Sequence, residues 1–113
     1  MSDSCIFCKI VRHEIPATVV AENDRLVAFR DIGAQAPVHV LVIPKAHMTS
    51  LNDVSDFALM GEMSQMAVEI ARREGIADRG YRVVVNTNAD GGQTVDHLHL
   101  HVLGGRHMDW PPG

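Results

Sequence analysis

The sequence lacks the features that would indicate a membrane or a nucleic acid as a partner. No apolar stretch approaches the roughly 20 residues that a membrane-spanning helix needs, and residues 1–4 lack the basic and apolar character of a signal peptide. There is no basic run, and the formal net charge is −4, which argues against binding to a phosphate backbone. We therefore expect a cytoplasmic protein that acts on small ligands.

Repeats, low-complexity segments and linkers are also absent from the sequence. Its 113 residues fit one domain that spans residues 1–113. A domain of this size buries only about two thirds of its unfolded surface. A metal or a second subunit would therefore be a natural supplement to its core.

Hydrophobic patterning predicts an α+β fold, with a mostly antiparallel sheet of about five strands and one long helix. Residues 18–31 read as a hairpin that turns at Asn23 and Asp24. Further strands are expected over residues 38–44, 81–87 and 95–103. The helix is expected over residues 52–74, capped by Asn52 or Asp53, because apolar residues recur there at three- and four-residue steps. They are Val54, Phe57, Met60, Met63, Ala67, Ile70 and Ala71.

Three of the seven histidines lie close together in the last predicted strand. Because alternate residues of a strand share a face, His97, His99 and His101 would point the same way and could surround one ligand. Imidazoles in this arrangement suit either a metal site or a nucleophile that attacks phosphorus. The preceding loop, with Gly91, Gly92 and Thr94, offers main-chain N–H groups and a hydroxyl to an anion, which favours phosphoryl chemistry.

The two cysteines, Cys5 and Cys8, form a Cys-x-x-Cys pair near the start of the chain. A stable disulfide is not expected in a reducing compartment, and a redox pair would need a thioredoxin-like setting that the pattern does not show. Zinc requires two further ligands, for which His47 and the histidine cluster are available. The alternative is a pair of free thiols, and the spacing favours zinc.

The run His97–Leu103 resembles the signature of the histidine triad (HIT) family, in which three histidines alternate with apolar residues. The resemblance covers nearly the whole chain, and the closing Trp-Pro-Pro-Gly of residues 110–113 is similar to the nucleotide-binding branch of the family. The other matching segments are Ile6-Phe7, Glu14–Ala17, Ala28-Phe29, Asp31-Ile32, Gln35–Pro37, His39, Val42–Lys45, His47, Val85-Asn86, Gly91–Gln93 and Leu103–Arg106.

The resemblance implies a hydrolase that acts on the α-phosphate of purine nucleoside phosphoramidates, such as adenosine 5′-monophosphoramidate. His99 would be the nucleophile that forms a nucleotidyl-histidine intermediate, His101 would contact the phosphate, and His39 would hydrogen-bond to His99. Asn86 and Thr94 would contact the leaving group and the phosphate; serine is common in the family at the second position, and Thr94 keeps its hydroxyl. The expected nucleotide-binding residues are Phe7, Phe29, Asp31, Ile32, Asn86, Gly92, Gln93, Thr94, His99 and His101.

The resemblance also implies a structural zinc and a homodimer. Some bacterial members and the related galactose-1-phosphate uridylyltransferases hold zinc with a Cys-x-x-Cys and two histidines, which match Cys5, Cys8, His47 and His97 here. The zinc would have a closed shell, and no catalytic metal is expected. Similar proteins pair their sheets edge to edge across a dimer and reach the partner's site with the C-terminal tail.

Two alternatives to the phosphoramidase remain open on the sequence. One is a module that binds or senses purine nucleotides with negligible turnover, because a family site does not prove catalysis. The other is hydrolysis by a zinc-bound water held by the three histidines of the predicted strand. The intact central histidine, His99, favours the covalent mechanism.

Overall fold

The sheet of the computed structural model, which describes residues 4–113, consists of five antiparallel strands in the order β1-β2-β3-β5-β4. This confirms the expected α+β fold. The long central strand β3 pairs with β2 on one side and β5 on the other, and β1 and β4 are the edges. The strands are β1 (Val19–Glu22), β2 (Leu26–Arg30), β3 (Val38–Pro44), β4 (Tyr81–Val84) and β5 (Leu100–Gly104).

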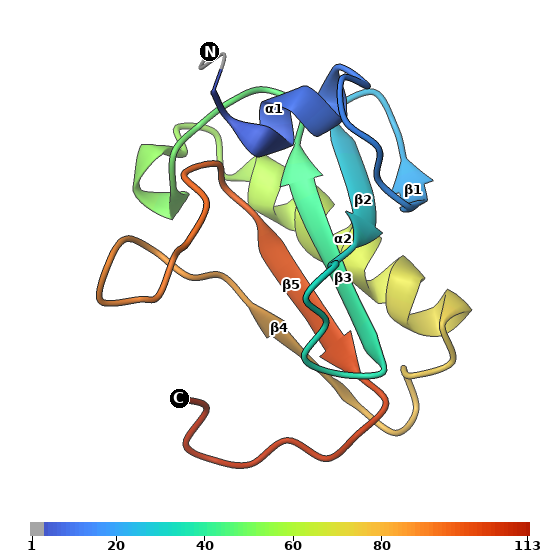
Figure 1. The fold of residues 1–113 in the computed structure, drawn as a ribbon. Coiled ribbons are helices and arrows are strands. Elements are labelled where there is room, and N and C mark those ends of the chain that lie inside the picture. The colour runs from blue at the N-terminus through green and yellow to red at the C-terminus, as the bar shows by residue number, and fades with distance from the viewer. Residues whose placement is uncertain (1–3) are drawn as a thin grey trace.

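The two α-helices lie on opposite faces of the sheet (Figure 1). Helix α2 (Ala58–Arg73) packs its apolar side on β3 and β5 and forms the larger core. The short helix α1 (Ile6–Val11) covers the other face, where Phe7 joins a smaller core with Phe29 and Leu41. Alternate side chains of β3 and β5 therefore enter two different cores, and the histidines belong to the α1 side.

The β1–β2 hairpin is confirmed, with its turn at the predicted position. The side-chain oxygen of Asn23 accepts hydrogen bonds from the backbone N–H groups of Arg25 and Leu26, at 3.0 and 2.9 Å. Asparagine commonly closes a turn in this way, because its amide substitutes for a backbone acceptor. Strand β3 also has the predicted bounds, 38–44.

The predicted start of the long helix is wrong. Residues 51–53 form a separate 3₁₀ turn, η1 (Leu51–Asp53), in which Ser50 and Asp53 complete a capping box. The backbone becomes extended at Val54, and α2 begins only at Ala58, whose N–H donates to the Asp56 carboxylate. Phe57, predicted to lie on the buried face, is 60% exposed because it precedes the helix.

Strands β5 and β4 are shorter than the strands predicted over residues 95–103 and 81–87, and one bend in the chain before Leu100 accounts for both differences. The β3–β5 ladder begins at the pair Val42 and Leu100, and the chain bends before it, where Leu98 N–H donates to the Met48 carbonyl. His97 and His99 therefore lie before β5. Strand β4 ends at Val84, paired with His101, because the segment before Leu100 no longer runs as a strand beside it.

No helix within residues 4–113 is long and apolar enough to cross a membrane.

Candidate active site

His99 and His101 line a cavity of about 280 Å³ between α1, β2 and the segment that enters β5. Leu41 of β3 and the loop residues Thr94 and Val95 also contribute to its wall. Five more of the predicted nucleotide-binding residues also line this cavity. Those that line it are Phe7, Phe29, Asp31, Ile32, Thr94, His99 and His101.

The carbonyl of His97 determines which nitrogen of His99 is free. His99 Nδ1 lies 2.7 Å from that carbonyl oxygen and must donate a proton to it, because a carbonyl only accepts. In the neutral ring, Nε2 then carries the lone pair. The His99 ring is buried and lies edge-on to Phe7, with centroids 5.2 Å apart. The structure thus gives His99 a defined tautomer, with its lone pair at Nε2.

A chain of hydrogen bonds determines the tautomer of His101. The backbone N–H of Gln35 donates to His39 Nδ1 at 3.0 Å, so the proton of neutral His39 is on Nε2. That N–H lies 2.9 Å from His101 Nδ1, which accepts. His101 therefore carries its proton on Nε2, and this is the one buried side-chain nitrogen or oxygen in residues 4–113 without a hydrogen-bond partner. It is a donor available to a ligand oxygen.

The expected hydrogen bond from His39 to His99 is therefore wrong, because His39 contacts His101 instead. In the β3–β5 register His39 lies opposite Leu103, two residues beyond His101, on the same face. Asp31 Oδ2 also lies 3.4 Å from His39 Nε2. His39 thus supports the third histidine of the triad, and the main chain supports the second.

Burial keeps the supporting histidines neutral. Burial, together with the neighbouring His99 and His39, lowers the pKa of His101 to about 4, against the opposing effect of the Asp31 carboxylate. The pKa of His39 is also lowered by burial, against the opposing effect of Asp31. Near neutral pH the chain from Gln35 to His101 therefore holds the tautomers described above.

The remaining triad histidine, His97, faces a different site. Its Nε2–H donates to the Pro44 carbonyl at 2.8 Å, which leaves a lone pair on Nδ1. Cys5 Sγ, Cys8 Sγ and His47 Nδ1 lie 3.4, 3.6 and 3.2 Å from that nitrogen, and Cys8 Sγ lies 3.2 Å from His47 Nδ1. The structure thus brings together all four predicted metal ligands.

These four of the six distances among the ligand atoms fit a tetrahedral zinc site, and all six are within 4.8 Å. Zinc bonds of about 2.3 Å to sulfur and about 2.0 Å to nitrogen place two nitrogens about 3.3 Å apart, and a nitrogen about 3.5 Å from a sulfur. The observed separations of 3.2–3.6 Å match these values. The pKa of the Cys8 thiol is raised, chiefly by burial, so deprotonation there would require a strong cation such as a metal.

The glycine loop before the histidines is organised by Gln93. Its amide nitrogen donates to the carbonyls of Thr49 and Val95, and its amide oxygen accepts from the N–H of Asn88. Gly91 is required by a close approach, because an added Cβ would lie 2.5 Å from the carbonyl oxygen of Thr87. Gly92 and Gln93 lie outside the described lining of the cavity, as does Asn86, half-buried beyond β4.

Sequence comparison identifies relatives of known family. A model of the HIT domain matches residues 12–108. The purine nucleoside phosphoramidase of Escherichia coli is 49% identical over 108 residues, which cover 94% of this chain and 91% of that protein. An uncharacterized HIT-like protein of Synechococcus elongatus is 51% identical over the full length of both chains.

Solved structures agree with this result. The HIT family hydrolase of Legionella pneumophila superposes with a TM-score of 0.94 at 53% identity, and the match covers 97% of this chain and 100% of that one. A histidine triad protein of Clostridium difficile has a TM-score of 0.93 at 42% identity, with 96% of each chain covered.

The chain belongs to the HIT domain family.

With these relatives, the chain is a hydrolase with the HIT-like fold. The extent of the domain, predicted as residues 1–113, stays a prediction beyond the matched 12–108. Sequence patterns do not identify much of the apolar wall of the cavity, because its members come together from α1, the segment after α1, β3 and the loop before β5 only in the folded chain. Its missed members are Ile6, Ile10, Ile15, Pro16, Ala17, Leu41 and Val95.

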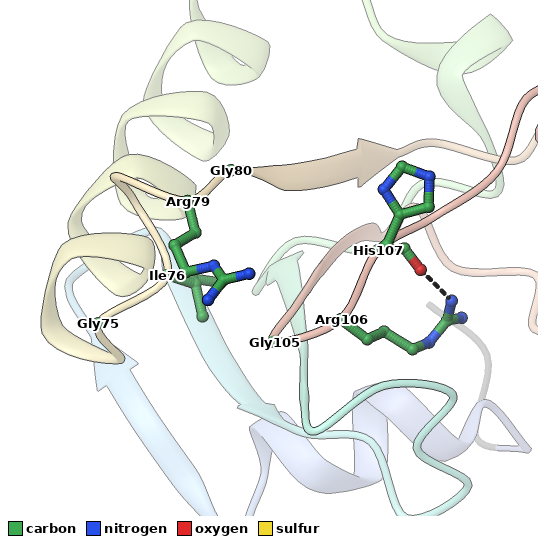
Figure 2. A pocket seen from close by; sticks show the side chains of 7 residues that line it. All are labelled: Gly75, Ile76, Arg79, Gly80, Gly105, Arg106 and His107. Atoms are coloured by element: carbon green, nitrogen blue, oxygen red, sulfur yellow. Dashed lines mark hydrogen bonds between the residues drawn. The ribbon is translucent and has the colours of Figure 1, made fainter.

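A second cavity of similar size, about 270 Å³, lies away from the HIT histidines. Figure 2 shows that its side chains come from the turn after α2, with Arg79, and from the segment after β5, with Arg106 and His107. Arg106 is engaged with the carbonyls of Gln35 and His107. None of the predicted site residues lines it. His13 and His107 are exposed.

Proposed function

We propose that this HIT hydrolase cleaves purine nucleoside phosphoramidates at the α-phosphate through a covalent nucleotidyl intermediate on His99. The observation that carries the proposal is the pair of complementary histidines on one cavity. His99 offers a lone pair at Nε2, and His101 offers a proton at Nε2. The 49% identity with a purine nucleoside phosphoramidase supports the substrate class.

The residues would act in two steps. In the first, Nε2 of His99 attacks phosphorus, the P–N bond breaks, and the amine leaves with a proton from solvent. The His99 ring becomes cationic, and the His97 carbonyl stabilises the charge through Nδ1–H. In the second, water attacks phosphorus, the P–Nε2 bond breaks and a proton of the water passes to solvent, which yields the nucleoside monophosphate and restores neutral His99.

Other side chains would bind the phosphate and the nucleoside. His101 Nε2–H would donate to a phosphoryl oxygen, and Thr94 would bind the phosphate, while Asn86 would contact the leaving group. We propose the apolar wall formed by Phe7, Phe29 and Ile32 for the base, and Asp31 for the ribose. Gly92 and Gln93 would contribute through the backbone of the loop, since the Gln93 amide is occupied within it.

Replacement of His99 tests the mechanism. We expect His99→Ala to lower turnover of adenosine 5′-monophosphoramidate by more than about a thousandfold and to leave AMP affinity within a few-fold. His107→Ala, at an exposed histidine, is the matched control. Quenching in alkaline denaturant, under which a phosphorus–imidazole bond persists, should reveal a nucleotidyl adduct on His99 by peptide mass.

The results separate the competing functions. Full activity of His99→Ala would refute the covalent mechanism. Binding of AMP by the wild type with negligible turnover would instead indicate a nucleotide sensor. Activity that is abolished by chelation without any adduct would indicate catalysis by a zinc-bound water.

We also propose a structural zinc bound by Cys5, Cys8, His47 and His97. When bound, zinc would cross-link α1, the loop after β3 and the segment before β5. We expect one zinc per chain in protein purified without chelator. His47→Gln should lower this content severalfold, whereas His107→Gln should not. A wild type with only traces of zinc would refute the site.

A homodimer joined along β4 is the proposed assembly. β4 is an edge strand, its Val83 is 44% exposed, and Trp110 in the tail is 83% exposed. Pairing with a second copy would cover these groups and the free strand edge. Light scattering should give a dimer mass, and Val83→Lys should shift it toward the monomer.

We further propose a cytoplasmic location, without membrane or nucleic-acid partners.

A further inference from the structure

Helix α1 is too short to hold its own position. It has 6 residues, whereas isolated helices below about 12–15 residues are marginal in water. Its inward side chains, Phe7 and Cys8, are buried, and Cys5 caps it by accepting the Cys8 N–H. The place of α1 on the sheet therefore depends on tertiary contacts, which include the packing of Phe7 and the contacts of its two cysteines.

Phe7 connects this helix to both sites. It is only 6% exposed and lines the nucleotide cavity. Its ring lies edge-on to the metal-site residue His97, with centroids 5.9 Å apart, and edge-on to the nucleophile His99 at 5.2 Å. A displacement of α1 would therefore move a wall of the cavity and a direct contact of the nucleophile together.

His97 provides a second connection through its backbone. Its Nδ1 faces the two cysteines and His47, while its carbonyl accepts the proton of His99 Nδ1 at 2.7 Å. Anything that holds the His97 side chain also holds the carbonyl that defines the tautomer of His99.

The nucleotide cavity adjoins a second cavity that reaches two of the four metal-site residues. This second cavity, of about 420 Å³, opens beside Cys5 and His47. Three residues, Ile6, Thr94 and Val95, line both cavities. A ligand in the nucleotide cavity would therefore contact residues that also lie beside Cys5 and His47.

We propose that zinc at the Cys/His cluster and nucleotide in the cavity bind with positive coupling, and that Phe7 and the His97 carbonyl carry it. In this proposal Phe7 is a positioning residue, because it contacts the ring of His99 and holds it in place. The inference rests on the zinc and nucleotide sites proposed above. It adds that zinc occupancy regulates nucleotide affinity without taking part in the reaction.

The coupling must be reciprocal, because it is a free energy shared by two binding equilibria. If zinc tightens AMP binding by some factor, AMP tightens zinc binding by the same factor. Coupling between sites in proteins commonly amounts to about fivefold or more. We expect at least about a fivefold effect here, since two separate contacts connect the sites.

Zinc affinity measured at equilibrium tests the proposal. The distribution of zinc between the protein and a chromophoric chelator is measured with and without saturating AMP. We expect AMP to tighten zinc binding by at least about fivefold. Phe7→Leu should keep its zinc but respond less than about twofold, whereas Phe57→Leu, at an exposed phenylalanine remote from α1, should respond like the wild type.

The outcomes distinguish this inference from the proposals beneath it. Wild type that binds both zinc and AMP but has the same zinc affinity with and without AMP overturns the coupling alone, and so does a Phe7→Leu response equal to that of Phe57→Leu. Protein that hydrolyses the phosphoramidate but holds no zinc overturns the zinc site and the coupling, while the hydrolase proposal stands. Absence of AMP binding overturns the nucleotide site and the coupling together.

Discussion

Acid should destabilise this protein through His101 in particular. The imidazole is partly buried, accepts at Nδ1 from His39, and has no partner within the described residues at Nε2. Protonation would place a second N–H against the His39 donor and a charge beside two other histidines. Burial and these neighbours lower the pKa of His101 from 6.5 to about 4.

The magnitude follows from proton linkage. A histidine with a lowered pKa binds fewer protons in the folded chain than in the unfolded chain, so stability rises with pH between the two pKa values. The stability that His101 contributes is complete above pH 6.5 and is lost as the pH falls toward 4. Each pH unit across this interval is worth about 1.4 kcal/mol, so the loss is about 2 kcal/mol by pH 5 and about 3 kcal/mol by pH 4.

Urea unfolding at fixed protein concentration between pH 7 and pH 4.5 measures this loss. The wild type is compared with His101→Gln, in which residue 101 cannot titrate. This comparison is needed because acid also protonates candidate metal ligands and the other histidines, in both proteins alike. We expect the free energy of unfolding of the wild type to fall by about 2 kcal/mol more than that of the variant by pH 5. His107→Gln, at an exposed histidine, should keep the wild-type slope. Equal slopes for the wild type and His101→Gln would refute the reasoning.

Three substitutions test the packing around the site. Gly61→Ala, at an exposed position in α2 where an added Cβ meets nothing within 4 Å, should raise the free energy of unfolding by about 0.5–1 kcal/mol; a decrease in urea unfolding would contradict this. Gly91→Ala places a Cβ 2.5 Å from the Thr87 carbonyl oxygen, so the loop that carries Thr94 must shift. We expect kcat/KM to fall by about tenfold or more, and an unchanged value would show that the loop position does not matter. Ile70→Ala, in the larger core, should cost about 2–5 kcal/mol in urea unfolding with little change in KM, and a cost below about 1 kcal/mol would mean that the core refills.

Sequence patterns correctly predict those elements that depend on residues close together in the sequence. The Asn23 turn and the strand over 38–44 occur where expected, because turn residues and flanking prolines act within a few residues. The helix begins later than predicted, because Ser50 and Asp53 cap a separate turn. The strand that contains the histidines is shorter than predicted, since alternation alone does not show where a ladder loses its partner.

The site shows the same division between local and long-range causes. The triad spacing and the Cys-x-x-Cys by themselves indicate candidate site residues, and the four candidate metal ligands meet as expected. Only the tertiary structure decided what each histidine contacts. The β3–β5 register places His39 against His101 and not His99, and the bend before β5 sends His97 toward the cysteines. Residue types and spacings specify available donor and acceptor atoms, whereas contacts between segments 62 or 92 residues apart depend on how the whole chain packs.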